Sequence, residues 1–337
     1  MNNNYAYLKK IYNLKNKNIV DYSQDKIYIM FLCENKYYCL KNNKLVNYSL
    51  SIPLNVLEVV DSIEKIYKIK IVNYFPVCFL NESSILITCK IKKVNFLYME
   101  EIKKYNEILK LSNEKAKYYS DEYDDETLVM EKYSKRYEIY DKYIKKYIIT
   151  SKKRKKKELR ELIKKLIGDA KSVIDVSCGD SCDVFKVCDD LDMVVGNDIN
   201  LYQLKNDEKK FSNVIYTNDN ILDFSFQENA FDASFCKNTL HHMDNEREIK
   251  QLLNSVTKIA KKTIIIEIED PKKTGKIPYL FNKYLYTKFL KDAGNYFITF
   301  STFKKVIDST LGNRCDINYF MFENILGKYM IALIEKR

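Results

Sequence analysis

Two apolar runs that end at small or acidic residues constrain this chain most. The first run, residues 173–176, breaks at the small-residue turn 177–181, Ser-Cys-Gly-Asp-Ser. The second run, residues 194–197, ends at Asp198, which lies 23 positions after Asp175. This spacing is typical of a βαβ unit whose first turn leaves room for a ligand and whose second strand ends in a carboxylate that can bind a ribose. The runs therefore predict parallel strands joined by an amphipathic helix.

Composition sets broad limits on the protein. With 337 residues and 46% apolar residues, the chain is long enough for two domains with buried cores. The net charge of +11 would favour nucleic acid or an anionic membrane as a partner, but Lys, Asn, Ile and the 28 Tyr are all frequent together, which indicates a compositional bias. No signal pattern begins the chain and no run reaches 18 apolar residues. We expect a cytoplasmic protein without membrane insertion.

The nine cysteines have no repeated C-x-x-C spacing. Their number is odd, and the closest set, Cys178, Cys182 and Cys188, falls on and after the small-residue turn. A disulfide framework or a zinc site would need regular spacing, so the sequence predicts reduced, buried thiols and no metal site.

Residues 1–111 form a predicted small α+β domain. Short apolar runs bounded by Asn- and Lys-rich turns indicate strands, and helical spacing of apolar residues indicates helices. The predicted strands are residues 27–32, 37–40, 74–80 and 84–90, and the predicted helices are residues 56–67 and one opened by Tyr98-Met99-Glu100-Glu101-Ile102. This order faintly resembles a Nudix-like domain. Residues 61–66 lack the several carboxylates that such domains use for Mg²⁺, so the resemblance implies the fold without hydrolysis.

Residues 112–170 lack Pro and are predicted to form a helical linker or lid. The tyrosine stripe of this region either packs against a neighbouring domain or covers an active site; it comprises Tyr118, Tyr119, Tyr123, Tyr133, Tyr137, Tyr140, Tyr143 and Tyr147. The six consecutive cations at 152–157 either contact phosphates or form a solvated helix face.

Residues 171–337 alternate between strands and helices, which predicts an α/β fold. Near-continuous β-branched runs such as residues 263–266 indicate a parallel sheet covered on both faces. The predicted strands are residues 173–176, 193–197, 214–216, 231–236 and 263–268, with helices between them that include residues 246–260. Residues 316–323 and 328–335 follow a helix at 301–311, and their short connection predicts an antiparallel hairpin.

Four motifs in this region resemble those of class I S-adenosylmethionine (SAM)-dependent methyltransferases. They are residues 175–181, Asp198, residues 218–224 and residues 231–243, in the family's order. The resemblance implies a seven-stranded Rossmann-like sheet with a C-terminal antiparallel hairpin. It also implies SAM as cofactor, held by Asp175, Ser177, Gly179, Ser181, Asp198, Ile199, Asp219, Asn220, Lys237 and Asn238.

The resemblance further implies a role for each motif. Asp198 would accept both ribose hydroxyls, Asp219 would bind the adenine amino group, and Asp232 would be structural. The family usually has Gly-x-Gly-x-Gly in the first motif, whereas this chain has Ser177 and Ser181 at the flanking positions. A tight turn in a fold that no longer binds cofactor therefore stays open as an alternative.

His241 and His242 are the candidate catalytic residues, because imidazole titrates near neutral pH. In the family such a pair often orients the loop instead. Glu267, Glu269 and Asp270, at the end of the next strand, are alternative bases. Methyl transfer from a sulfonium is an in-line displacement, so alignment alone can supply much of the catalysis.

The predicted substrate is a small molecule methylated on O, N or C. Enzymes that methylate base amines usually carry Asn/Asp-Pro-Pro-aromatic where this chain has residues 237–240, and no Cys lies beside a Pro as cytosine C5 chemistry would need. The aromatic-rich segment 271–300 either caps a small substrate or packs on the core. Two alternatives remain: a non-catalytic SAM-binding or partner-recognition protein, and an RNA methyltransferase that uses residues 152–157. The oligomeric state is not predicted.

Overall fold

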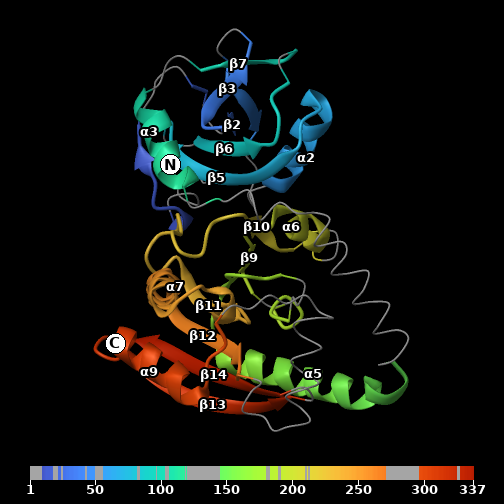
Figure 1. Ribbon diagram of the computed structural model, residues 1–337, viewed down its shortest axis with the longest axis vertical. Coiled ribbons are helices and arrows are strands. Elements are labelled where there is room, and N and C mark those ends of the chain that lie inside the picture. Colours follow the sequence, from blue (N-terminus) through green and yellow to red (C-terminus); the bar gives the residue numbers. More distant parts are fainter. Residues whose placement is uncertain are drawn as a thin grey trace. The chain divides into compact units, whose positions relative to one another are not determined.

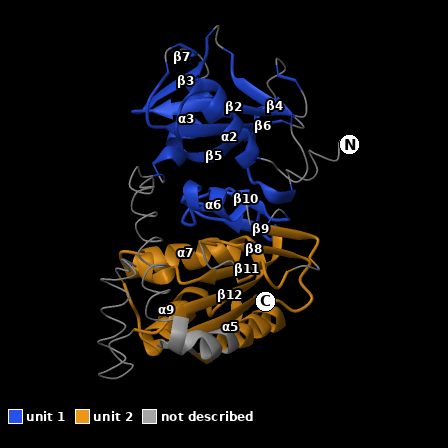
Figure 2. Cartoon of the chain, turned by 90° about the vertical axis from the view of Figure 1, so that its right-hand side faces the viewer, with its two compact units in different colours: residues 1–124, 195–230 blue, residues 125–194, 231–337 orange. Residues whose placement is uncertain are grey.

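The computed structural model divides into two compact units, each described by itself (Figure 2). Unit 1 comprises residues 1–124 and 195–230, and unit 2 comprises residues 125–194 and 231–337. The structure describes residues 10–17, 22–23, 26–41, 44–49, 56–81, 84–95, 97–102, 106–117, 119, 145–179, 183–188, 191–208, 211, 213–270, 296–324 and 327–337.

The first sheet lies within unit 1. Its order is β1-β5-β6-β2-β3-β7, and β4 pairs with β2. The strands are β1 (Lys15–Asn16), β2 (Lys26–Cys33), β3 (Lys36–Leu40), β4 (Val46–Ser49), β5 (Ile71–Phe79), β6 (Ile85–Ile91) and β7 (Met99–Glu101). Every residue of β5 is buried. Helices α2 (Val56–Tyr67) and α3 (Asn106–Ala116) also belong to this region (Figure 1).

Most predicted elements of this region are confirmed, and α2 has the predicted bounds. Its apolar residues Val56, Val59, Val60 and Ile63 recur at helical spacing and are all buried. The helix predicted to open at residues 98–102 is wrong. Strand β7 lies there and pairs antiparallel with β3, because burying Met99 in that ladder outweighs the helix propensity of the two glutamates.

Unit 1 also holds the connection that follows β9 (Met193–Asn197), a strand shared by the two units. Helix α6 (Leu201–Glu208) begins after Asn200, whose side-chain oxygen accepts from Gln203 N at 3.1 Å and so caps the helix. Strand β10 (Ile215–Thr217) then pairs parallel with β9.

Unit 2 contains the remaining elements. The second sheet, which also includes β9 and β10, has the strand order β10-β9-β8-β11-β12-β14-β13. The elements are α5 (Lys145–Ile167), β8 (Ser172–Asp175), β11 (Phe231–Lys237), η3 (Leu240–His242), α7 (Glu246–Lys258), β12 (Ala260–Ile268), α9 (Phe300–Leu311), β13 (Cys315–Asn324) and β14 (Gly327–Lys336). Strands β8, β11 and β12 are parallel, whereas β14 and β13 are antiparallel. The α/β class, the parallel strands and the C-terminal hairpin are therefore confirmed.

Local sequence explains how α7 forms. The side chain of Asn245 accepts a hydrogen bond from Glu248 N and caps the helix, and Ile249, Leu252, Leu253 and Val256 form one buried face. One predicted helix is absent from the described residues: between β8 and β9, residues 183–188 form turns. The segment still buries Val184, Phe185 and Cys188, and the carboxylate of Asp183 accepts a hydrogen bond from Lys237 at 2.6 Å.

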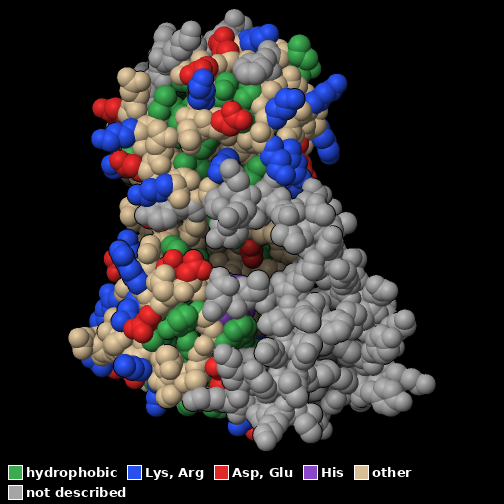
Figure 3. Space-filling view, in the orientation of Figure 1, with side chains coloured by type: hydrophobic (Ala, Val, Ile, Leu, Met, Phe, Trp, Pro, Cys, Tyr) green, Lys and Arg blue, Asp and Glu red, His purple; other side chains and the backbone are tan. Residues whose placement is uncertain are grey.

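The predictions made from composition concerned surface charge, the cysteines and membrane spans. Lys and Arg side chains are interspersed with Asp and Glu on the face shown in Figure 3. The eight described cysteines are all buried, as predicted, and none of these eight forms a disulfide. Among the described helices, none combines the length and the apolar character that a membrane span would need.

Candidate functional site

The glycine turn follows β8 in unit 2. Val176 N donates to Phe235 O at 2.9 Å, so the first residue after β8 stays bonded to β11. Gly179 has φ +46°, a backbone conformation that favours glycine. The hydroxyl of Ser177 bonds that of Thr239 and so ties the turn to the segment after β11. Asp175 is buried at the end of β8, and Ser181 lies outside the described residues.

The segment after β11 carries Lys237 and Asn238. Asn238 has φ +55°, and its backbone N–H donates to Ile266 O at 2.9 Å. Its side-chain oxygen is buried, and no donor within the described part of the chain reaches it. A buried acceptor of this kind costs free energy unless a partner satisfies it. The residue is therefore suited to receive a hydrogen bond from a ligand.

The amine of Lys237 is buried in an ion pair with Asp183, at 2.6 Å. Burial lowers the pKa of Lys237, but Tyr329 and Asp183 outweigh it and raise that pKa above its ordinary value. For Asp183 burial has the opposite sign and raises the pKa, but the charge of Lys237 outweighs burial and brings the pKa of Asp183 below its ordinary value. Arg160 of α5 also contacts Asp183, at 3.2 Å. Sequence reasoning missed Asp183, because nothing in its neighbourhood marks it as the partner of a lysine 54 positions away.

His241 is a buried, anchored residue. Its Nδ1 lies 2.7 Å from Glu267 Oε1, with 2% and 1% of the two side chains exposed. The other oxygen of Glu267 accepts from Leu240 N at 2.8 Å. The ring of His241 stacks on Phe297, with the ring centres 5.0 Å apart. Glu267, an alternative base in the sequence analysis, therefore holds the loop after β11 to the end of β12.

His242 differs from its neighbour. Its side chain is exposed, although its ring centre lies only 4.2 Å from that of His241. Glu269 and Asp270 are half-buried beyond β12, and their backbone N–H groups bond Lys328 O and Ile298 O. Among the candidate bases described, His242 is the most accessible.

In unit 1, Asp198 and Ile199 follow β9. Asp198 is half-buried, and its Oδ1 accepts from Asn200 N at 2.8 Å. The backbone oxygens of Asp198 and Ile199 accept from the side chain of Asn218, at 2.7 and 2.9 Å. The carboxylate of Asp198 thus binds the backbone of Asn200, the residue that caps α6, and helps to fix the turn before this helix. The carboxylate lies at the edge of that turn.

Asp219 follows β10 and is an internal carboxylate. It is 1% exposed. Its Oδ1 accepts from the hydroxyls of Tyr119 and Ser225, both at 3.1 Å, and its Oδ2 accepts from Ser225 N at 3.1 Å. Burial raises its pKa. The residue predicted to bind adenine thus already receives three hydrogen bonds.

Tyr119 comes from the predicted helical linker. Its ring stacks on Phe75 with centres 4.6 Å apart, and its hydroxyl accepts from Asn220 N at 3.2 Å. Its hydroxyl pKa is raised well above its ordinary value by burial and by the charge of Asp219. For this residue the packing interpretation of the tyrosine stripe holds. The side chains of the other seven tyrosines lie outside the described residues.

Further contacts join the small domain to the strands after β8 within unit 1. Tyr74 N donates to Asn218 Oδ1 at 3.0 Å, and the Tyr74 hydroxyl donates to Tyr216 O at 3.1 Å. Lys205 of α6 contacts Asp61 and Glu64 of α2 at 2.8 and 2.7 Å. These acids, considered above for a Nudix-like metal site, therefore pair with a lysine. No group of three or more possible metal ligands occurs among the described residues.

The basic run 152–157 lies within α5. Lys155 pairs with Glu158 at 2.9 Å, and Lys157 with Glu161 at 3.8 Å. These pairs along one helix support the interpretation as a solvated helix face. Of the aromatic segment 271–300, residues 271–295 lie outside the described part of the chain.

Comparisons with solved structures return methyltransferases. The methyltransferase domain of bacterial CtHen1 is 12% identical, with 54% of this chain and 99% of that chain covered and a TM-score of 0.41. The N-methyltransferase NodS from Bradyrhizobium japonicum is 12% identical (54% and 96% covered, TM-score 0.40). An O-methyltransferase family protein from Burkholderia thailandensis is 14% identical (53% and 55% covered, TM-score 0.42). Similarity of this degree identifies neither a substrate nor a mechanism.

Sequence comparisons are more specific about the region involved. The search of curated proteins finds no match. A family model does match, and its residues include the glycine turn, Asp198, Asp219 and the histidine pair. Residues 173–263 of this chain are thus similar to a family described as a methyltransferase domain.

Proposed function

We propose that this protein is a SAM-dependent methyltransferase that acts on a small molecule. One observation carries the proposal: within the span that matches a methyltransferase domain, each of the four motifs includes the residues that directly follow the end of a parallel strand. Ligands of open α/β sheets bind at the carboxyl ends of the strands. The proposed domains are residues 1–111, the linker 112–170 and the methyltransferase domain 171–337.

Several described residues fit this cofactor. Gly179 has the positive φ that a close backbone approach uses, Asn238 offers a buried acceptor, and Asp198 has a carboxylate at the edge of its turn. When bound, SAM supplies a methyl group already activated by its sulfonium. The proposed SAM-binding set is Asp175, Ser177, Gly179, Ser181, Asp198, Ile199, Asp219, Asn220, Lys237 and Asn238.

Asp219 can bind SAM only if one of its present hydrogen bonds is replaced. An adenine amino group would have to replace one of the three donors that the carboxylate now receives. Two of these come from Ser225, six positions away, whereas the Tyr119 hydroxyl comes from another segment. We therefore propose that adenine binding at Asp219 displaces the hydroxyl of Tyr119.

The histidines take different parts in this proposal. His241, fixed by Glu267 and Phe297, holds the loop after β11 in position. His242 is exposed and is the proposed proton acceptor for substrates that must lose a proton. Alignment of the nucleophile supplies the rest of the rate acceleration.

The test is isothermal titration of the full chain with SAM and with S-adenosylhomocysteine. We expect both to bind at one site. Absence of binding by folded protein would remove the methyltransferase proposal and favour a partner-recognition protein. Binding of both without methyl transfer to any acceptor in a broad radiolabelled screen would favour a non-catalytic SAM-binding protein.

A further inference from the structure

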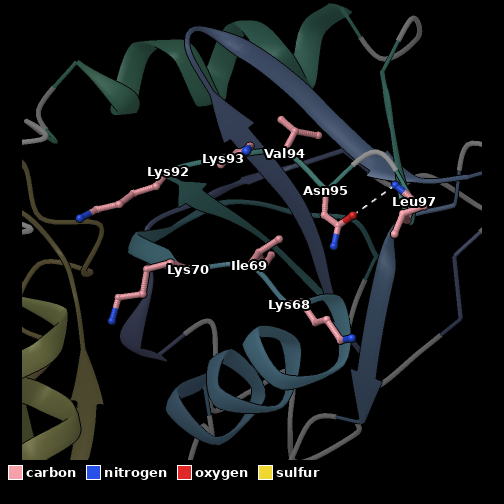
Figure 4. A pocket seen from close by; sticks show the side chains of 8 residues that line it. All are labelled: Lys68, Ile69, Lys70, Lys92, Lys93, Val94, Asn95 and Leu97. Atoms are coloured by element: carbon pink, nitrogen blue, oxygen red, sulfur yellow. Dashed lines mark hydrogen bonds between the residues drawn. The ribbon is translucent and has the colours of Figure 1, made fainter.

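A second candidate site lies in the small domain of unit 1, away from the motifs described above. It is a pocket of about 490 Å³, within the range of small-molecule sites. The connection between α2 and β5 forms one side, and the segment after β6 forms the other (Figure 4). Its lining comprises Lys68, Ile69, Lys70, Lys92, Lys93, Val94, Asn95 and Leu97.

Backbone and amide hydrogen bonds hold the two sides together. Lys92 N donates to Lys70 O at 3.2 Å. The side chain of Asn95 donates to Tyr67 O at 2.9 Å and accepts from Leu97 N at 3.2 Å. The amide of Asn95 therefore holds the wall of the pocket in shape. The groups that the pocket offers to a ligand are lysine amines and apolar side chains.

Four of the eight lining residues are lysines and none is acidic. Lys68, Lys92 and Lys93 are exposed, and Figure 4 shows the side chains of Lys70 and Lys92 extending to the same side. Lysine ammonium groups bind phosphates as point charges. A concave site lined by cations of one sign also attracts anions from solution. The pocket is thus suited to a ligand with more than one negative charge.

Lysine is abundant throughout this chain, but exposed apolar side chains are not. Among the described residues, five large apolar side chains are exposed, and three of them lie in the segments that supply these lysines. Leu97 is 76% exposed, Ile66 55% and Tyr98 38%. Of these three, Leu97 lines the pocket, and Ile66 and Tyr98 are close to lining residues in the sequence. The lining therefore combines four cations with an exposed apolar side chain, and a nucleotide offers both phosphates and an apolar base face to such a site.

Lys68 differs from the other three lysines in its backbone conformation. It follows the last residue of α2 and has φ +52°, a conformation in which glycine or asparagine is favoured by about 1 kcal/mol. A cation at a helix C-terminus interacts favourably with the helix dipole, which accounts for this lysine but not for those on the other side of the pocket.

We propose that this pocket binds the phosphate groups of a nucleotide, either free or as a unit of a single-stranded nucleic acid. Its concave shape favours this ligand over a flat anionic membrane surface. The proposal does not depend on methyl transfer.

The first test measures binding by the full chain to a fluorescein-labelled single-stranded RNA of about 12 nucleotides and to ADP. The pocket variant carries Lys68→Gln, Lys70→Gln, Lys92→Gln and Lys93→Gln. Its matched control carries Lys164→Gln, Lys165→Gln, Lys258→Gln and Lys305→Gln, which are exposed lysines outside the pocket.

We expect the pocket variant to bind at least roughly tenfold more weakly, with a salt dependence reduced by up to about 3 in log–log slope for the RNA. The control should stay within about twofold of the unmodified protein. Binding of RNA and ADP would assign the site to nucleotides in general, and binding of ADP alone to free nucleotides. Equal losses in both variants, no binding by the unmodified protein, or binding only to phosphatidylserine vesicles would overturn the proposal.

A second variant separates binding from folding. Lys68→Gly removes one amine and relieves the left-handed backbone, so its melting temperature should not fall while its affinity for the bound probe weakens. Asn35→Gly, at φ +64° in an exposed turn, changes a similar backbone site and should leave affinity unchanged. Undiminished affinity of Lys68→Gly would contradict the assignment.

Discussion

The turns after β9 and β10 carry two acids with the same predicted cofactor and opposite environments. Asp198 is half-buried, and its Oδ1 accepts from Asn200 N of its own turn at 2.8 Å. Asp219 is 1% exposed and receives hydrogen bonds from Tyr119 and Ser225. The fold therefore leaves these two strand-end acids with different exposure: Asp219 is enclosed, whereas Asp198 stays partly accessible to solvent.

The largest expected effect is on stability, from Asp219→Ala. This substitution leaves three buried donors without their acceptor, so the free energy of unfolding should fall by about 3 to 4 kcal/mol. Urea denaturation measures this loss. Asp223→Ala, a half-buried acid in the same turn, should cost less than about 1 kcal/mol. Equal costs would mean that burial of Asp219 does not set its role.

The second effect is on binding, from Asp198→Ala. Loss of a charge-assisted hydrogen-bond pair to the ribose should weaken SAM binding by about 2 to 3 kcal/mol, roughly 30- to 150-fold, with little change in stability. Titration calorimetry and urea denaturation of the same variant test both parts. Unchanged affinity would show that the ribose lies elsewhere.

The two histidines differ in the same way as the two acids: His241 is buried and His242 is exposed. His241→Ala leaves the buried carboxylate of Glu267 without its imidazole and removes the stacking on Phe297, which should cost about 2 kcal/mol of stability. His242→Ala, at an exposed position, should stay within about 0.5 kcal/mol of the unmodified protein. Similar losses for both would remove the distinction between an anchored and an accessible histidine.

The sequence predicted backbone well and side-chain environments poorly, for a physical reason. Local periodicity gave the bounds of α2 and β9 to the residue. The donors to Asp219, by contrast, include Tyr119, 100 positions away, and His241 meets a glutamate 26 positions away. Only the fold brings such pairs together, so the sequence located the strand ends but not the exposure and hydrogen-bond partners of the acids that follow them.

The smallest expected effect concerns a third acid, Asp232, whose structural role was predicted and is confirmed. It accepts from Lys171 N, Ser172 N and the Ser172 hydroxyl at 3.0 to 3.1 Å, and pairs with Lys261 at 2.8 Å. The hydrogen bond from Lys261 is the largest cause that brings its pKa down to about 2, in contrast to the raised pKa of Asp219.

Because the folded-state pKa of Asp232 lies below its ordinary value of 3.8, its carboxylate stabilises the fold above about pH 4, and this contribution is lost as the pH falls toward 2. With allowance for partial exposure, Asp232→Asn should cost about 1 kcal/mol at pH 7 and almost nothing near pH 2. Urea denaturation of both proteins across this range measures the difference. A cost that persists at pH 2 would mean that the hydrogen-bond geometry, rather than the charge, holds β8 to β11 at this point.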